Sequence, residues 1–120
     1  MRIKQSELKK WLEEYKKLIG VDREVRLRLK MYKTRAATAD LRRGVLILNK
    51  NLLDLGEDVI KYLILHELVH LKLGSPHHDA RFWKLLEHYA HALGIDILSA
   101  QNKIIGKLFE INGIGKKGKS

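Results

Sequence analysis

The feature that most constrains this chain is the stretch from residue 59 to residue 83, VIKYLILHELVHLKLGSPHHDARFW. Its first part places apolar residues on most sides of a helix, which indicates a buried helix. In such a helix His66 and His70 lie one turn apart on the same face, and Glu67 directly follows the first histidine. Ionisable side chains are rarely buried without a partner, so the stretch predicts a shared ligand such as a metal ion.

The order His-Glu-x-x-His has a chemical reason at each position. Two imidazoles at i and i+4 can provide two nitrogen ligands to one zinc ion. The glutamate is then placed as a general base toward a water molecule that the metal acidifies. An ordinary amphipathic helix can carry the same five residues by chance, but the apolar surroundings argue against it. We therefore interpret His66 and His70 as metal ligands and Glu67 as the catalytic residue of a zinc peptidase.

A third ligand should follow shortly after this helix. Catalytic zinc sites use three protein ligands and leave the fourth position to water. The turn at residues 74–76 lets the chain reverse before His77 and His78. From the residues alone, either of these two histidines can complete the site.

The segment from His78 to Trp83, HDARFW, resembles the His-x-x-Arg-Phe-Trp element of minigluzincins and of SprT-like metallopeptidases. The preceding GVLILNKNLL is similar to the strand and connector before HExxH in those families, and the resemblance covers residues 33–89. It implies a small zinc metalloendopeptidase with one zinc ion, a protein or peptide substrate, and His78 as the third ligand. It also implies that a C-terminal segment, residues 96–120, keeps the enzyme latent as a zymogen, within one molecule or between two.

Composition limits the number of domains, the kinds of metal ligand and the cellular location that we expect. With 120 residues, the chain is expected to form one domain spanning residues 1–120. It has no cysteine, so every metal ligand must be nitrogen or oxygen. The N-terminus lacks the apolar core of a signal peptide, and no apolar run is long enough to span a bilayer. We therefore expect a cytoplasmic protein without a membrane partner.

The formal net charge is +10, and most of the excess Lys and Arg lies in residues 1–50. Such a charge suits binding to nucleic acid, but it also keeps a small protein soluble. We favour solubility as the explanation of the charge. The many lysines, arginines and glutamates and the absence of cysteine are typical of heat-adapted proteins. We hypothesise a thermophilic source.

The pattern of apolar residues predicts an α+β fold. A first helix should begin at a Ser6 cap and end at Gly20. Three strands follow at residues 25–31, 35–41 and 45–48, and the continuous apolar run of the third predicts that it is covered on both faces. They should form a small three-stranded sheet.

The remaining elements follow the sheet. The HExxH helix should carry Glu57 and Asp58 in its first turn, where negative charge is favoured. The next helix should begin at an Asp79 cap and end at Gly94. The tail beyond it mixes apolar residues with a closing GIGKKGKS; we expect the apolar part to be extended and the closing residues to be flexible.

An extended substrate can pair with the main chain of an edge strand, which needs little side-chain specificity. We expect this strand to comprise Arg35, Ala36, Ala37, Thr38 and Ala39. Downstream, His88 and Tyr89 are the nearest side chains that can donate a hydrogen bond to a transition state. For His88 and His91, a surface or capping role is the simpler expectation.

Two alternatives use the same histidines differently. The three-histidine pattern and the basic charge also resemble zinc-dependent endoribonucleases, although those enzymes lack a glutamate after the first histidine. A SprT-like peptidase recruited to nucleic acid is a further alternative. A purely structural zinc needs four protein ligands, and only three good candidates lie close together in the sequence unless His77 and His78 both bind.

Overall fold

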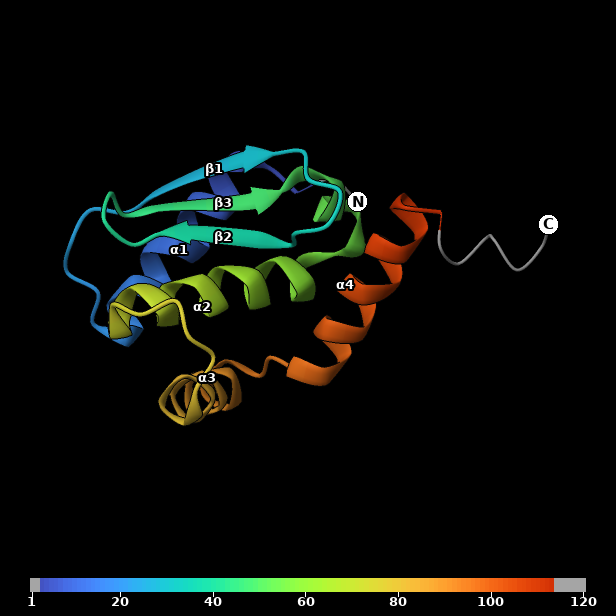
Figure 1. The fold of residues 1–120 in the computed structure, drawn as a ribbon. Helices are drawn as coiled ribbons and strands as arrows, with labels where there is room; N and C mark the ends of the chain where they lie inside the picture. Colours follow the sequence, from blue (N-terminus) through green and yellow to red (C-terminus); the bar gives the residue numbers. More distant parts are fainter. Residues whose placement is uncertain (1–2, 114–120) are drawn as a thin grey trace.

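A three-stranded sheet lies above a layer of helices (Figure 1). The computed structural model describes residues 3–113. Its elements are, in chain order, α1 (Gln5–Ile19), β1 (Arg26–Lys30), β2 (Ala37–Asp40), β3 (Val45–Asn49), the 3₁₀ helix η1 (Lys50–Leu55), α2 (Glu57–Leu73), α3 (Ala80–Leu93) and α4 (Ile97–Ile111). The expected α+β fold with a small three-stranded sheet is confirmed.

The strands are ordered β1-β3-β2, so β1 and β2 are both edge strands. β3 pairs in parallel with β1 and antiparallel with β2. β2 is shorter than the expected residues 35–41, but its position at an edge agrees with the prediction. The chain therefore passes from one edge of the sheet to the other before it returns along the centre.

One buried amide fixes that passage. Asn49 is fully buried at the end of β3, and its Nδ2 donates to the carbonyl oxygens of Tyr32 and Arg35 at 2.9 and 2.8 Å. Its Oδ1 accepts from the backbone N–H of Asn51 at 3.0 Å. Because buried polar groups must be paired, this side chain holds the β1–β2 connection against the centre of the sheet.

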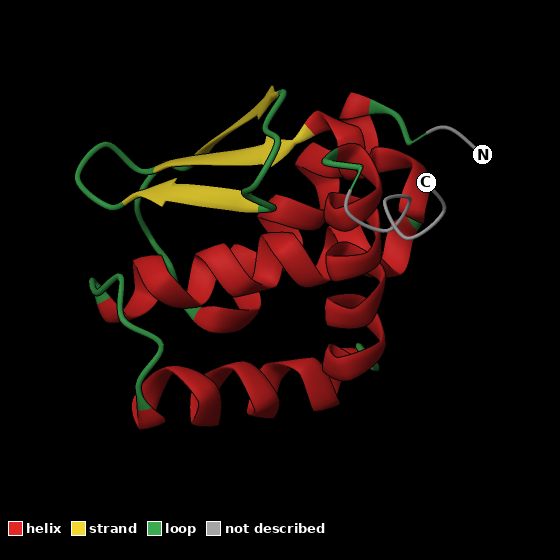
Figure 2. Cartoon of the chain, turned by 45° about the vertical axis from the view of Figure 1, so that its right-hand side comes forward, coloured by secondary structure: helices red, strands yellow, loops and turns green. Residues whose placement is uncertain are grey.

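The two faces of the sheet differ. Leu46 and Leu48 of β3 are fully buried against the helices, whereas Val45 and Ile47 point the other way and are half-buried. Within residues 3–113 no helix packs on that outer face (Figures 1 and 2). The expectation that β3 is covered on both faces is therefore wrong: its continuous apolar run reflects β propensity at the centre of a sheet, not two covered faces.

The helix carrying HExxH is the centre of the fold. α1, α3 and α4 all pack against α2, which also lies under β2 and β3. Apart from half-buried Lys61, its residues from Val59 to Leu65 are buried, as its apolar sequence predicts. Glu57 and Asp58 lie in its first turn, and Gly74 ends it with a φ of 63°.

The ends of the flanking helices partly differ from expectation. α1 begins at Gln5, because the backbone N–H of Lys4 is bound by the carboxylate of Glu7 at 3.1 Å; Ser6 lies inside the first turn and does not cap the helix. Gly20 ends α1 as predicted. Asp79 caps α3 by accepting from the N–H of Phe82 at 3.1 Å, and Gly94 ends α3, both as predicted.

The C-terminal segment is not extended where it is described. Asp96 caps a further helix, α4, whose buried residues are Ala100 and Ile104. The expectation of an extended apolar part is therefore wrong: apolar residues at 97, 100, 104, 108 and 111 follow a helical period, and this periodicity was a signal for α4 that we missed. The expected flexible closing segment lies, from residue 114, outside the described residues.

Candidate metal centre

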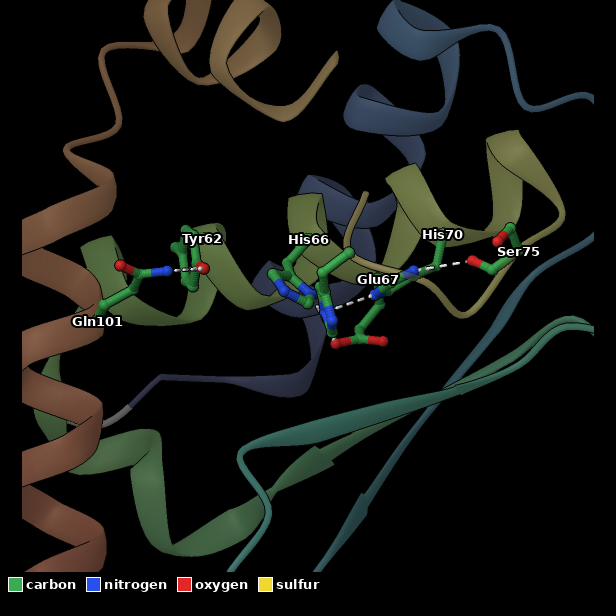
Figure 3. A network of polar contacts seen from close by, with 7 residues as sticks. Tyr62, His66, Glu67, His70, Ser75 and Gln101 are labelled. Atoms are coloured by element: carbon green, nitrogen blue, oxygen red, sulfur yellow. Dashed lines mark hydrogen bonds and ion pairs between the residues drawn. The ribbon is translucent and has the colours of Figure 1, made fainter. Parts of the chain in front are cut away.

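α2 presents the HExxH side chains to one place. His66 is half-buried, whereas Glu67 and His70 are each 5% exposed. The ring centroids of His66 and His70 lie 5.0 Å apart, as expected one turn apart on a helix. Figure 3 shows these side chains projecting from the same part of α2.

The loop after α2 brings a third histidine to this pair. The N–H of Ser75 donates to the carbonyl oxygen of His70 at 3.2 Å, which turns the chain back along the helix end. His78 then lies with its Nε2 3.1 Å from the Nε2 of His70. One ring nitrogen from each of His66, His70 and His78 lies within 4.8 Å of the others.

This geometry fits a tetrahedral metal ion. Two nitrogens bound to zinc at 2.0–2.1 Å are about 3.3 Å apart. The Nε2 atoms of His70 and His78 are therefore already separated by a distance suited to ligands of one ion. The chain has no cysteine, so the three imidazoles form an all-nitrogen ligand set that suits zinc.

Hydrogen bonding and burial favour the neutral, ligating form of these rings. His70 Nδ1–H can donate to the carbonyl oxygen of Ser75 at 2.9 Å (Figure 3), which leaves its Nε2 with a lone pair for a metal. Burial lowers the pKa of His70 below its usual value, and burial also lowers the pKa of His78. Both rings are therefore neutral at neutral pH, as metal ligands must be.

Glu67 lies beside the three histidines without being one of them. Its Oε2 is 3.0 Å from Nδ1 of His66, and its side chain is buried. An ionised carboxylate is only an acceptor, so this contact makes His66 Nδ1 the protonated nitrogen and leaves Nε2 to face a metal. The carboxylate can then take a proton from a water molecule at the same place.

Phe82 supports all three histidines. Its fully buried ring stacks on His70 at 4.4 Å and contacts His66 and His78 edge-on, each at 4.8 Å between centroids. Trp83 flanks His78 at 5.9 Å. The sequence reasoning missed the role of Phe82 as the floor of the site. The signal was its place four residues after His78, in the first turn of α3.

Tyr62 is a further neighbour that the sequence reasoning missed. It lies one turn before His66, contacts that ring edge-on at 5.6 Å, and is buried. Its hydroxyl accepts from Nε2 of Gln101 at 3.2 Å, which joins α4 to the helix that carries the histidines (Figure 3). Burial raises the pKa of Tyr62, so the hydroxyl stays protonated.

The other singled-out residues lie elsewhere. His77 is exposed and its backbone N–H donates to Ser75 Oγ, whereas His78 enters the cluster. His88 is exposed on α3 and contacts Tyr89, and neither belongs to the group of converging nitrogens. A role for that pair as transition-state donors stays a prediction.

Comparisons with known proteins agree with this geometry. The YgjP-like metallopeptidase domain matches residues 2–93, which end before α4. The chain is 39% identical over 77 residues to the uncharacterized protein aq_aa15 of Aquifex aeolicus, covering 63% of this chain and 70% of that one. It is 30% identical over 91 residues to the uncharacterized protein MJ0123 of Methanocaldococcus jannaschii, covering 75% and 81%.

Two solved structures are also similar. The metallopeptidase zymogen of Pyrococcus abyssi abylysin matches with a TM-score of 0.62 and 31% identity, over 67% of this chain and 76% of that one. The metallopeptidase zymogen of Methanocaldococcus jannaschii jannalysin matches with a TM-score of 0.71 and 27% identity, over 84% of this chain and 96% of that one.

None of the helices within residues 3–113 is long and apolar enough to cross a membrane.

Proposed function

From the premise that this chain belongs to the YgjP-like metallopeptidase family, and is therefore a metallopeptidase, we propose that it is a zinc-dependent endopeptidase. One zinc ion would be held by His66, His70 and His78. The observation that carries the proposal is the convergence of three imidazole nitrogens beside a buried glutamate.

When bound, zinc would polarise the scissile carbonyl and lower the pKa of water from 15.7 toward about 7. Glu67 would take the proton of the attacking water and pass it to the departing amine. Its burial keeps the carboxylate close to the histidines, and Phe82 holds the imidazoles in place from below. A three-ligand set leaves a position for water, which supports a catalytic role over a structural one.

The edge strand β2 is the proposed substrate site. The N–H of Asn49 in β3 donates to the carbonyl oxygen of Ala36, just before β2. In the antiparallel register, every second residue from Ala36 onward therefore directs its backbone N–H and C=O groups toward β3. Ala37 and Ala39 therefore direct their N–H and C=O groups to the open edge. Within residues 3–113, no hydrogen bond outside the ladder uses these groups. An extended peptide could pair there without side-chain selection.

Zinc content tests the ligand assignment. We expect one zinc per chain in the wild type and in His77→Ala, and little or none in His78→Ala, measured by elemental analysis after purification. Glu67→Gln should retain zinc but fail to cleave casein. A wild type that takes up no zinc after reconstitution, or a His78→Ala variant that retains it while His77→Ala does not, would contradict the assignment.

We further propose that the C-terminal segment, residues 96–120, restrains the enzyme in a latent form, within one molecule or between two. Similarity to two structures described as zymogens supports this, as does the Gln101–Tyr62 hydrogen bond beside His66. No hydrogen bond or ring contact among residues 3–113 joins α4 to the three histidines. Within one molecule, the restraint by the described part of the segment would therefore act through Tyr62, and residues 114–120 lie outside the described residues.

Truncation tests latency, provided that the deletion leaves the fold intact. Deletion from residue 102 onward removes buried Ile104 and should destabilise the domain, so loss of activity there is uninformative. Deletion of residues 114–120 leaves α4 in place. We expect this shorter chain to cleave casein faster than the full chain at equal zinc content, and equal rates would remove residues 114–120 from the latency proposal.

A further inference from the structure

The sheet has a second open edge, formed by β1. Arg26 N–H donates to the carbonyl oxygen of Gly44 at 2.9 Å, so Arg26 and the alternate residues after it direct their backbone groups toward β3. Leu27 and Leu29 direct theirs away from the sheet. Among residues 3–113, no hydrogen bond outside the ladder uses the N–H or C=O of either leucine. Two donors and two acceptors are thus available to another strand.

A groove runs beside this edge. It has a volume of about 830 Å³ and lies between β1 and α1. Its lining includes Leu8 and Leu12 of α1 and Leu27 and Leu29 of β1, and polar and charged side chains of both elements, Glu13 and Lys9 among them, form most of the rest. A strand added to β1 would place every second side chain in this groove, because side chains alternate between the faces of a sheet.

The outer face beside the same edge is basic. Arg26, Arg28 and Lys30 are exposed there. They adjoin a hollow of about 710 Å³ lined by arginines, two acidic side chains and two apolar ones: Arg23, Arg26, Arg28, Arg43, Glu24, Asp40, Val45 and Ile47. The balance of charge favours an anionic partner.

These cations are not equally available. Arg23 is committed to the carbonyl oxygens of Leu41 and Arg42 at 2.7 and 2.8 Å. Arg26 and Arg43 form long ion pairs of 4.0 Å with acidic neighbours. Neither Arg28 nor Lys30 has an ion pair or hydrogen bond from its side chain within the described residues, but Lys30 Nζ lies over the ring of Tyr32 at 5.8 Å. Arg28 is therefore the cation most available to a partner.

We propose that the β1 edge binds an extended acidic segment of another protein by strand addition. Acidic side chains two residues apart are spaced by about 6.6–6.8 Å, which matches the spacing of Arg26, Arg28 and Lys30. The intervening apolar side chains would enter the groove beside α1. A preferred ligand thus alternates acidic and apolar residues.

Other occupants fit this edge less well. A second copy of β1 would place like charges opposite each other, which destabilises strand pairing. Single-stranded nucleic acid is bound by cations together with aromatic side chains, and the outward positions of the three strands carry no aromatic residue. The proposal does not depend on the zinc peptidase assignment, because β1 lies at the edge opposite β2.

Binding of a labelled seven-residue peptide that alternates glutamate and valine tests the proposal. We expect the full chain to bind it at low salt, measured by fluorescence anisotropy, and to bind a peptide with the same residues in two blocks more weakly. Arg28→Glu should lower the affinity about tenfold by exchanging attraction for repulsion, whereas Lys84→Glu, the same charge change on exposed α3, should not. Equal binding of both peptides would overturn the proposal, as would binding of a thymidine dodecamer but of neither peptide.

Backbone methylation of the peptide tests strand addition itself. Methylating the nitrogens of the valines blocks antiparallel pairing to β1, and methylating those of the glutamates blocks parallel pairing. One of the two modified peptides should lose binding, and its identity gives the direction of the added strand. Undiminished binding of both would overturn strand addition.

Discussion

The two edges of the sheet offer the same backbone groups in different surroundings. β2 lies over α2, the helix with the histidines, and its side chains are small, apart from Asp40. β1 lies beside α1 and carries Arg26, Arg28 and Lys30 on its outer face. An edge without large side chains can accept many sequences near the reacting groups, whereas a charged edge selects a partner away from them.

This contrast separates two tasks that a small peptidase must combine. Under the proposed function, hydrolysis requires a peptide backbone close to Glu67 and the histidines, and side-chain selection there would restrict the bonds that can be cut. Selection at β1 leaves that site unrestricted. The predictions below test whether the two edges are independent.

The largest effect should come from Glu67→Gln. Loss of the general base should lower kcat by about 10²–10⁴-fold, because the carboxamide cannot accept the water proton. Binding of the acidic peptide at β1 should be unchanged. Glu87→Gln, on the exposed side of α3, is the matched control and should retain kcat. A change in both readouts with Glu67→Gln would show that the edges are coupled.

Helix α1, below the β1 edge, carries a tyrosine that should make the fold sensitive to alkali. Burial, with the nearby charges of Glu14 and Glu57, raises the pKa of Tyr15 on α1 to about 12. Tyrosine titrates near 10 in the unfolded chain, so its contribution is complete below pH 10 and is lost as pH rises through 12. The wild type should lose about 2 kcal/mol by pH 12 relative to Tyr15→Phe.

Urea unfolding of both proteins from pH 8 to pH 12 measures this difference. Groups shared by both proteins, such as Tyr62, cancel in the comparison. A constant difference in the free energy of unfolding across this range would show that Tyr15 is not buried in the folded chain.

Proline substitution tests the open edge of β2. Ala39→Pro removes an N–H that faces away from the sheet, so the fold should persist while kcat/KM falls about tenfold through one lost substrate hydrogen bond. Thr38→Pro removes an N–H that faces β3 and should instead lower the melting temperature. Unchanged kcat/KM in a folded Ala39→Pro would argue against substrate pairing at β2.

The smallest effect concerns the link from α4 to α2. Gln101→Ala removes the donor to Tyr62 and should lower the free energy of unfolding by about 1 kcal/mol. Asn102→Ala, exposed and without a hydrogen bond from its side chain within residues 3–113, is the control. If α4 restrains the site, Gln101→Ala should also raise the rate of casein cleavage.

The sequence predicted much of this architecture because its signals were local. HExxH, the Asp79 cap and the period of α2 each depend on residues a few positions apart. The convergence of His78 with His66 depends on how α2 and α3 pack, and was reached through the resemblance and not from spacing. The open outer face of β3 is a tertiary feature, which no local pattern reports, and the site floor made by Phe82 depends on how α3 packs against α2.

The pairing of β3 has a consequence for how the chain assembles. Val45 pairs with Asp40 across the turn at residues 41–44, so only a short loop must close. Val45 also pairs with Arg26, but there the chain that must close into a loop includes all of β2. Closing the shorter loop costs less entropy, so we expect the β2–β3 hairpin to form first and β1 to join late. Until β1 joins the sheet it is an unpaired strand. Its alternating cations would then keep partly folded chains from aggregating through this strand.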